Sequence, residues 1–276
     1  MSRRKVSKEL WLALEPLIPY GSFVASPTKS CGWRRSVDDR RRDRAALSGI
    51  LYVLHTGIPW EDLPQELGFG SGMTCWRRLR DWQAGGVWDK LHRAMLVRLR
   101  EHDQIDWSRA SIDGASVPSP GGREQTGPSP TDRGKLGSKR HLVVDARGVP
   151  LAITVTGANR HDSIAFESTL DAIPAIRGLD GRSRKRPDKL HADKAYDCRR
   201  CRQYLKRRGI RARIARKGIE SRERLGRYRW VVERTHAWFA GFGKIRVRFE
   251  RRLDIHCALL SLAAAIICAR FVDDLC

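Results

Sequence analysis

The first hundred residues carry apolar side chains at helical spacing. Between Ser71 and the pair Gly85-Gly86, large apolar residues recur every three positions and arginines occupy the opposite face. Similar patterns, bounded by Ser, Asp, Gly or Pro, predict helices at residues 7–18, 38–56, 71–84 and 87–100. We therefore expect a small all-α, helix-turn-helix-like unit, although a helical cap with solvated arginines has the same pattern.

After Trp107 the pattern changes from helical to extended. Apolar runs that end at turn residues predict strands at residues 110–114, 140–144, 151–156, 189–193 and 210–215. Further helices are expected at residues 163–176 and 197–208, around residues 229–239, and at 257–269, with a strand-like stretch at 245–249. The segment 116–137, rich in Gly, Pro and Ser, is expected to be a mobile loop.

The change of pattern places a domain boundary near residues 101–108, between a helical domain at 1–105 and a second domain at 106–276. In the second domain, three strands are followed by a helix, a strand, a helix, a strand and more helices. This is the element order of a ribonuclease-H-like fold, a mixed α/β fold whose middle strands lie side by side.

Basic residues dominate the charge of the chain. There are 54 Lys and Arg against 31 Asp and Glu, and the formal net charge is +23. Because 41% of the residues are hydrophobic, including nine Trp, this charge belongs to a folded protein rather than to a disordered tail. Basic runs such as Arg40-Arg41-Arg42 and Arg207-Arg208 are spread along the sequence, which favours a long phosphate-contacting surface on nucleic acid over a membrane partner.

The cysteines and the apolar C-terminal run indicate a cytoplasmic protein. Seven cysteines without regular spacing, and no apolar signal-peptide core, are typical of a reducing compartment. Cys198 and Cys201 form a C-x-x-C pair, but no second pair stands at zinc-ribbon spacing, so we expect no metal or redox role for them. The apolar run 257–269 is shorter than the roughly 20 residues that span a bilayer, and predicts a buried helix.

Three carboxylates stand where they could converge. Asp113 ends the first predicted strand and Asp193 the fourth, and these strands are neighbours in the expected fold. Glu233 lies on the later helix that packs across them, with Arg229 four residues before it. Two Mg²⁺ ions about 4 Å apart, bridged by such carboxylates, catalyse phosphodiester chemistry. The alternative for Glu233 is a surface ion pair with Arg229 at i, i+4 spacing.

Other acidic and histidine residues have simpler explanations. Asp145 falls in the turn between two strands and is expected to form that turn. Asp162 or Ser163 is expected to cap the next helix, with a catalytic role for His161-Asp162 as the less favoured alternative, and Asp197 is expected to cap the helix after Asp193. His191 and His236 flank the carboxylates and could contact phosphate, but partly buried structural histidines are equally common. The sequence leaves both alternatives open for these two histidines.

Several motifs resemble those of the bacterial DDE transposases of the insertion sequence 5 group. The acidic motifs are Ser111-Ile112-Asp113-Gly114-Ala115, His191-Ala192-Asp193-Lys194-Ala195-Tyr196-Asp197 and Arg229-Trp230-Val231-Val232-Glu233-Arg234-Thr235. The segments at residues 156–162 and 50–64 are also similar to that group. The resemblance covers almost the whole chain, with the motifs in the same order. The wider group often has a Tyr and a Lys where this chain has Gly226 and Ala240, although Tyr228 and Lys244 stand nearby.

The resemblance implies a ribonuclease-H-like catalytic domain in which Asp113, Asp193 and Glu233 hold Mg²⁺, with Mn²⁺ as a substitute. The expected partner is double-stranded DNA, both the element ends and the target, bound by a homodimer on paired ends in the bacterial cytoplasm at the nucleoid. The residues expected to contact DNA are Arg77, Arg78, Arg80, Arg229, Arg234, His236 and Lys244.

The predicted function is that of a transposase. Such an enzyme binds the terminal inverted repeats of its mobile element, cuts at the ends and joins the free 3′-hydroxyls to target DNA by two-metal phosphoryl transfer. One alternative is a metal-dependent endonuclease or junction resolvase of the same fold, which would cut without joining. Another is a non-catalytic DNA-binding repressor derived from a transposase, against which the intact acidic triad argues.

Overall fold

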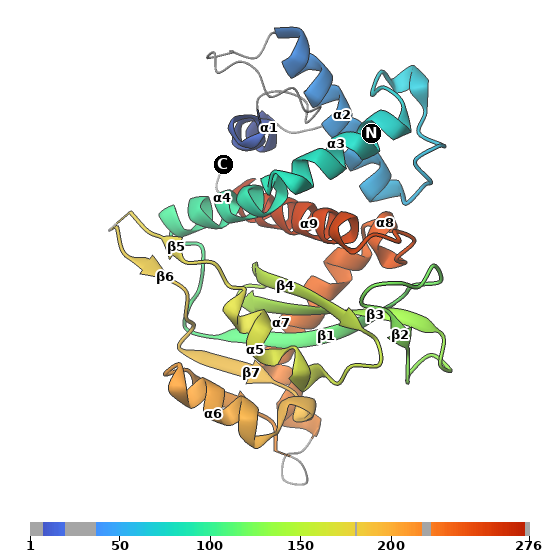
Figure 1. The fold of residues 1–276 in the computed structure, drawn as a ribbon. Coiled ribbons are helices and arrows are strands. Elements are labelled where there is room, and N and C mark those ends of the chain that lie inside the picture. Colours follow the sequence, from blue (N-terminus) through green and yellow to red (C-terminus); the bar gives the residue numbers. More distant parts are fainter. Residues whose placement is uncertain (1–7, 20–36, 180, 217–221, 274–276) are drawn as a thin grey trace, which may run out of the picture.

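The N-terminal helices lie on one side of the molecule and a mixed sheet on the other (Figure 1). Two long helices, Val87–Glu101 and Leu253–Asp273, lie between them. The computed structural model describes residues 8–19, 37–179, 181–216 and 222–273, and in the helix that begins at Arg222 it describes side chains from Tyr228 onward. The predicted mixed α/β architecture with a helical N-terminal region is confirmed.

The predicted N-terminal helices are present. They are α1 Lys8–Leu14, α2 Val37–Thr56, α3 Gly72–Ala84 and α4 Val87–Glu101, with a short 3-10 helix Glu15–Leu17 after α1 and another, Gln65–Leu67, before α3. Ser71 caps α3 as expected, because its Oγ accepts a hydrogen bond from the Thr74 N–H at 3.2 Å. Ser7, the first residue of the predicted helix 7–18, lies outside the described residues. The apolar residues at every third position of α3 include Met73, which was expected on the buried face but is 53% exposed; the buried stripe instead runs through Cys75, Leu79 and Trp82.

Within the described residues, six strands form the main sheet. They are β1 Ala110–Pro118, β2 Gly127–Pro128, β3 Leu136–Asp145, β4 Pro150–Gly157, β7 Lys189–Ala192 and β8 Arg211–Ile214. Strand β3 pairs antiparallel with β1, β2 and β4, whereas β7 pairs in parallel with both β1 and β8. The first and fourth predicted strands, β1 and β7, are therefore neighbours, as the ribonuclease-H-like arrangement requires.

Asp145 forms the turn between β3 and β4, as predicted. Its carboxylate accepts hydrogen bonds from the backbone N–H groups of Asp106, Arg147 and Val149 at 2.8–2.9 Å. Burial raises the pKa of this carboxyl to about 6, although the backbone hydrogen bonds act in the opposite direction. Both carboxylate oxygens of Asp145 are therefore used in hydrogen bonds that stabilise the turn.

Helices cover both faces of the sheet. On one face lie the 3-10 helix Asp162–Ile164, α5 Phe166–Asp171 and α6 Arg199–Arg207, where α6 follows a 3-10 turn at Lys194–Tyr196 and connects β7 to β8. On the other face α7, Arg222–Ala240, crosses β1, β3 and β7 (Figure 1). A small hairpin, β5 Ile176–Arg177 and β6 Ser183–Arg184, lies in the expected linker after α5.

Three sequence-based expectations differ from the structure. Residues 116–137 include the end of β1 and the whole of β2, so the expected loop contributes to the sheet. Helix α5 is shorter than the predicted 163–176, because the chain turns extended at β5. The strand expected at 245–249 is instead helix α8, Gly243–Arg246, followed by an extended segment. Arg248 explains that segment, because its buried guanidinium donates to the Glu124 carbonyl and to Ser138 Oγ, both at 2.8 Å.

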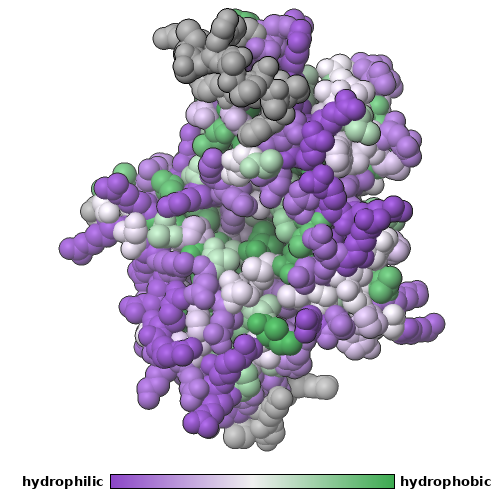
Figure 2. All heavy atoms as spheres, in the orientation of Figure 1, coloured by the Kyte–Doolittle hydropathy of each residue, from purple (hydrophilic) through white to green (hydrophobic). Residues whose placement is uncertain are grey.

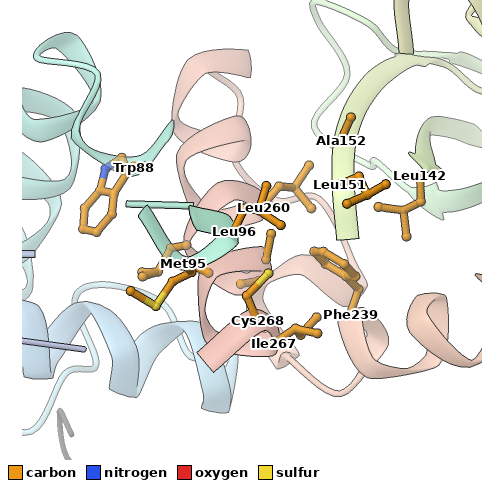
Figure 3. Packing of buried hydrophobic residues seen from close by; sticks show 14 of the residues in the cluster. Trp88, Met95, Leu96, Leu142, Leu151, Ala152, Phe239, Leu260, Ile267 and Cys268 are labelled. Atoms are coloured by element: carbon orange, nitrogen blue, oxygen red, sulfur yellow. The ribbon is translucent and has the colours of Figure 1, made fainter. Parts of the chain in front are cut away.

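The apolar C-terminal helix α9, Leu253–Asp273, lies in the core as predicted. By length and composition its segment Leu253–Val272 could span a membrane, but most of that segment is buried within the protein. Trp88, Met95 and Leu96 of α4 face Leu260, Ile267 and Cys268 of α9, while Phe239, Leu142 and Leu151 lie beyond (Figure 3). The helical region and the sheet therefore share one hydrophobic core.

A close backbone contact ties α2 to α8. Gly57 ends α2 with φ +81°, and a Cβ there would lie 2.7 Å from the backbone carbon of Gly243. A Cβ on Gly243 would in turn lie 2.6 Å from the carbonyl oxygen of Thr56. Only glycine at both positions permits this approach, so the contact between the helical region and the C-terminal part is specified by two residues 186 positions apart in the numbering.

The surface agrees with the basic composition. Hydrophilic residues cover most of the face shown in Figure 2, over both the helical region and the sheet region, and apolar residues gather in small areas near its centre. The size of the charge excess, 54 basic against 31 acidic residues, makes a polyanionic partner the natural complement of such a surface.

The shared core predicts cooperative unfolding. Leu96→Ala should lower the free energy of unfolding by roughly 2–5 kcal/mol, because this fully buried side chain lies at the contact between α4 and α9. Urea unfolding should show a single transition by tryptophan fluorescence and by far-UV circular dichroism. Leu179→Ala is the control, since Leu179 is 81% exposed and should change stability little. Two separate transitions in the variant would show instead that the helical region and the sheet form independent domains.

Buried histidines give the fold a dependence on pH. Burial, reinforced by nearby Arg or Lys, lowers the pKa of His141 and His191 to about 4 and that of His236 and His256 to about 3. These side chains are neutral in the folded protein near neutral pH. In the unfolded chain they would take up protons at the ordinary histidine pKa of about 6.5.

We therefore expect stability to fall as the pH drops from about 7 to about 5. Over this range the unfolded state binds protons that the native histidines do not bind. Each such proton lowers the free energy of unfolding by about 1.4 kcal/mol per pH unit. Asp113 and Asp145, each with a pKa raised to about 6, act in the opposite direction below that pH, but the four histidines outnumber them. Urea midpoints at the two pH values measure the effect, and His256→Gln should make it smaller. A midpoint that is equal or higher at the lower pH would contradict this assignment.

Candidate active site

Parallel pairing of β1 with β7 brings two aspartates together. Ser111 pairs with His191, and Asp113 and Asp193 stand two residues further along each strand. Asp193 keeps an extended backbone, φ −80° and ψ −177°, so the alternation of side chains continues to it. The two aspartates therefore lie on the sheet face that bears Ser111 and His191.

That face is the one covered by α7. The Ser111 hydroxyl donates to the Tyr228 carbonyl at 3.3 Å, and the rings of His191 and Tyr228 lie 5.0 Å apart. Further along α7, the backbone of Asp113 is close enough to His236 to affect its pKa. The sequence expectation that this helix packs across the two acidic strands is confirmed by these contacts. The expectation that Asp113 ends its strand was wrong, because β1 continues to Pro118 through its pairing with β3.

Asp113 is a largely buried carboxyl that interacts with two other carboxylates and with one arginine. Burial is the main reason that its pKa is raised to about 6, and the carboxylates of Asp193 and Asp162 raise it further. The Arg229 guanidinium and the Gly114 N–H act in the opposite direction. A bound cation would stabilise the ionised carboxylates in the same way that Arg229 does, and carboxylate oxygens are the ligands that Mg²⁺ and Mn²⁺ prefer. The residues present therefore fit the metal that the family resemblance implies.

Glu233 is held differently from the two aspartates. Its side chain is 59% exposed, and its Oε1 lies 3.7 Å from Nη2 of Arg229. Among the residues that the structure describes, no group of three His, Cys, Asp or Glu side chains is close enough to hold one metal ion. Arg229 also lowers the pKa of Asp113, so the same guanidinium interacts with both Asp113 and Glu233. The assignment of Glu233 to the metal site remains a prediction.

Asp162 lies close to Asp113, although its sequence position favoured a helix cap over a role at the site. Its Oδ1 lies 3.0 Å from Nζ of Lys139 and 4.0 Å from Nδ1 of His141. Gly114 makes room for it, because a Cβ on Gly114 would lie 2.7 Å from Asp162 Oδ1. The signal in the sequence was the Gly that follows Asp113, whose missing side chain admits a carboxylate from the opposite face of β1.

The expected helix caps near the site were wrong. His161 caps the 3-10 helix Asp162–Ile164, because its Nδ1 accepts from the Ser163 N–H at 3.3 Å. The N-cap of α6 is Cys198, whereas Asp197 binds Arg202 at 2.8 Å. Tertiary partners for the two aspartates replaced the local hydrogen bonds on which the sequence rule relies.

Tyr196 is a buried polar residue beside the carboxylates that the sequence analysis also missed. Its ring packs 5.5 Å from that of Phe166, and its hydroxyl has no hydrogen-bond partner among the described residues. Burial raises its pKa well above the ordinary value, and Asp162, Asp113 and Asp193 add to the shift. The phenol therefore stays protonated and remains able to donate a hydrogen bond near the site.

The basic residues that were expected to contact DNA from α7 and α8 lie in different environments. Arg229 is partly buried in its contact with Glu233, and Arg234 stacks between the rings of Trp230 and Trp238, 4.6 Å from each. His236 is buried beside Arg140, and its lowered pKa keeps it neutral. Lys244 is also buried, donating to the Ile58 carbonyl at 3.2 Å near Glu250. Because His236 and Lys244 are buried, their side chains present almost no surface to DNA.

The arginines of α3 are also unequal. Arg77 is exposed. Nε of Arg78 lies 3.4 Å from Oδ1 of the buried Asp43, and Arg80 binds the neighbouring Asp81 at 2.7 Å while stacking over Trp76. Arg78 therefore has a structural partner that the helical pattern alone could not show.

Comparison with known proteins identifies the family. A model described as "Transposase DDE domain" matches residues 106–268, and one described as "Putative transposase of IS4/5 family" matches residues 6–92. The chain is 52% identical over 147 residues to a putative transposase for insertion sequence element IS402 of Burkholderia cepacia, which covers 53% of this chain and 70% of that protein. It is 49% identical over 133 residues to an uncharacterized 16.2 kDa protein of the same insertion element, which covers 47% of this chain and 84% of that protein.

One family match covers the helical region and the other covers the α/β region. Asp113 and Asp193 lie within the match to the DDE domain. The resemblance seen in the acidic motifs is thereby confirmed. The chain belongs to the DDE transposases of the IS4/5 family.

Proposed function

We propose that this transposase binds the terminal inverted repeats of its own element, cleaves the DNA at the ends and joins the 3′-hydroxyls to target DNA. The observation that carries the proposal is the parallel pairing that puts Asp113 beside Asp193 under α7. The pKa of Asp113 supports it: burial is the main cause of its rise, and the further rise caused by Asp193 shows that the two carboxylates are close enough to interact, an arrangement that a divalent cation would stabilise.

Asp113 and Asp193 would hold Mg²⁺ or Mn²⁺, which when bound activates the attacking oxygen and stabilises the leaving one. Glu233 would become the third metal ligand once its ion pair with Arg229 breaks. A DNA phosphate could break that pair by binding the Arg229 guanidinium in place of Glu233. Arg229 would then change partner from Glu233 to the substrate. The exposure of Glu233 and the single 3.7 Å contact support an ion pair that exchanges readily.

The two reactions are in-line displacements at phosphorus. In the first, water attacks the phosphorus at the element end, and the bond to the 3′-oxygen breaks to leave a 3′-hydroxyl and a 5′-phosphate. In the second, this 3′-hydroxyl attacks a phosphorus of the target, whose own 3′-oxygen leaves. No covalent protein intermediate is needed, so one set of carboxylates serves both steps. The pairing of two ends further implies a homodimer, acting on the bacterial nucleoid in the cytoplasm.

The rival functions differ in a single product. A metal-dependent endonuclease or junction resolvase would release cut DNA without joining it, and a non-catalytic repressor would bind without cutting. Incubation of the protein with Mg²⁺, a labelled fragment carrying the inverted repeats that flank its gene, and a supercoiled target plasmid separates these cases. Joined products support the transposase, whereas cleavage alone favours the nuclease.

Substitution of the acidic residues tests the site. Asp113→Asn and Asp193→Asn should each reduce Mg²⁺-dependent cleavage by more than about 100-fold, since even outer-shell partners of metal ligands contribute roughly 10–100-fold. DNA binding in a gel shift should persist, and Asp188→Asn, at an exposed aspartate paired with Arg184, should leave both properties unchanged. Glu233→Gln should behave like the aspartate variants. Near wild-type cleavage by Glu233→Gln would instead assign Glu233 to a surface ion pair.

A second substitution series tests DNA binding by the helical region. Replacing Arg77, Arg78 and Arg80 together by Ala should weaken binding to an end fragment and reduce the slope of log K against log salt by about 0.9 for each phosphate that the variant no longer neutralises. Arg78→Ala alone should also lower thermal stability, because it leaves the Asp43 carboxylate buried without that partner. Arg77→Ala is the cleaner variant, since Arg77 is exposed. Unchanged end binding by the triple variant would remove α3 from the DNA interface.

A further inference from the structure

A basic pocket lies on the same face of the sheet as the paired aspartates. Its volume is about 370 Å³. It is lined by Ser108, Arg109, Lys189, His191, Arg213 and Tyr228. These residues come from the segment just before β1, from β7, from β8 and from α7, so parts of the chain far apart in the sequence build the pocket together.

The sheet register places the pocket in line with the active site. His191 pairs with Ser111 on one side and with Arg213 on the other. Side chains two residues apart on a strand share a face, so Lys189, His191 and Asp193 point to the same side of β7. The step from His191 to Asp193 is two residues, or roughly 7 Å. The pocket therefore begins about that far from the carboxylates.

The chemistry of the pocket suits an anion. Arg109, Lys189 and Arg213 contribute three positive charges, and none of the described lining residues is acidic. The Arg109 guanidinium stacks 5.0 Å over the Tyr228 ring, and its buried Nε has no hydrogen-bond partner among the described residues. His191 also lines the pocket, and its ring lies 5.0 Å from the Tyr228 ring.

We infer that this pocket binds a backbone phosphate of the DNA strand that is cleaved, with Arg109, Lys189 and Arg213 as its cationic contacts. The inference rests on the proposed function and adds a subsite to it. Phosphates of one strand are spaced about 3.4 Å along the duplex axis, so a pocket roughly 7 Å from the carboxylates would hold a phosphate within about two nucleotides of the scissile one. A phosphate held there fixes the position of the strand relative to Asp113 and Asp193.

Arg213 is the best residue to change, because its side chain is exposed on β8 and its removal opens no cavity in the core. Arg213→Ala should weaken binding to an end fragment about tenfold, as expected when a charged hydrogen bond is removed, and reduce the salt slope by about 0.9. Arg213→Lys should retain most of the affinity, because the charge is kept. Arg177→Ala, at an exposed arginine of β5 outside the pocket, is the control and should bind like the wild type.

A scan of the substrate identifies the phosphate. End fragments that each carry one neutral methylphosphonate, placed at successive positions around the cleavage site, are tested against wild type and Arg213→Ala. Wild type should lose about tenfold in affinity at one or two positions within about two nucleotides of the cut. Arg213→Ala should lose less at those same positions, because the arginine that would sense the charge is already absent, and this non-additivity is the signature of a direct interaction.

The outcomes separate this inference from the proposed function. If wild type cleaves and joins DNA, while Arg213→Ala and Lys189→Ala keep wild-type affinity and the same methylphosphonate profile, the pocket is not a phosphate site and the transposase function stands. If wild type neither cleaves nor joins end fragments, the proposed function fails, and the subsite fails with it. Thermal melting of each variant shows whether a change in binding comes from loss of folding, and Arg213→Lys provides a second, charge-preserving measurement.

Discussion

The structure depends on the burial of α9. This helix is apolar around most of its circumference, and water is a poor solvent for every side of it, so other elements must cover it. Helices α3 and α4 cover one side, and β4, α7 and α8 cover the other. Through α9, the N-terminal helices are packed onto the sheet region and are not joined to it by a linker alone. A DNA-binding surface on those helices would be held in a defined position relative to the active site.

At the active site, the controlling factor is the burial of the Asp113 carboxyl close to two other carboxylates. Parallel pairing of β1 and β7 puts Asp113 beside Asp193, and Asp162 approaches from the other face of the sheet past Gly114. Arg229 partly compensates this charge. Such a site has a strong electrostatic preference for a cation, and it also explains why basic groups gather a short distance away. The pocket around Arg213 would direct a polyanion towards an acidic centre that would otherwise repel it.

Much of the fold followed from local patterns. The periodicity of apolar residues located α2, α3, α4 and α9, and the turn chemistry of Asp145 located the hairpin of β3 and β4. The expectation at residues 245–249 failed because alternation of apolar and basic residues is also compatible with a segment whose arginine is buried. Arg248 satisfies its guanidinium against Glu124 and Ser138, which are distant in sequence, and no local rule anticipates such partners.

The sequence by itself determined the helical and extended elements, the family through its acidic motifs, and the position of Asp193 directly after a strand, because these depend on short-range periodicity and on residue type. It placed Asp113 at a strand end, but β1 continues to Pro118 through its pairing with β3, so Asp113 lies within the strand. Only the tertiary structure decided that Asp162 and Tyr196 join those aspartates and that His236 and Lys244 are buried. It also assembled the basic pocket from two strands, the segment before β1 and a helix. The reason is physical: burial, ion pairing and pKa shifts depend on distances between residues far apart in the chain, and those distances exist only after the sheet has formed.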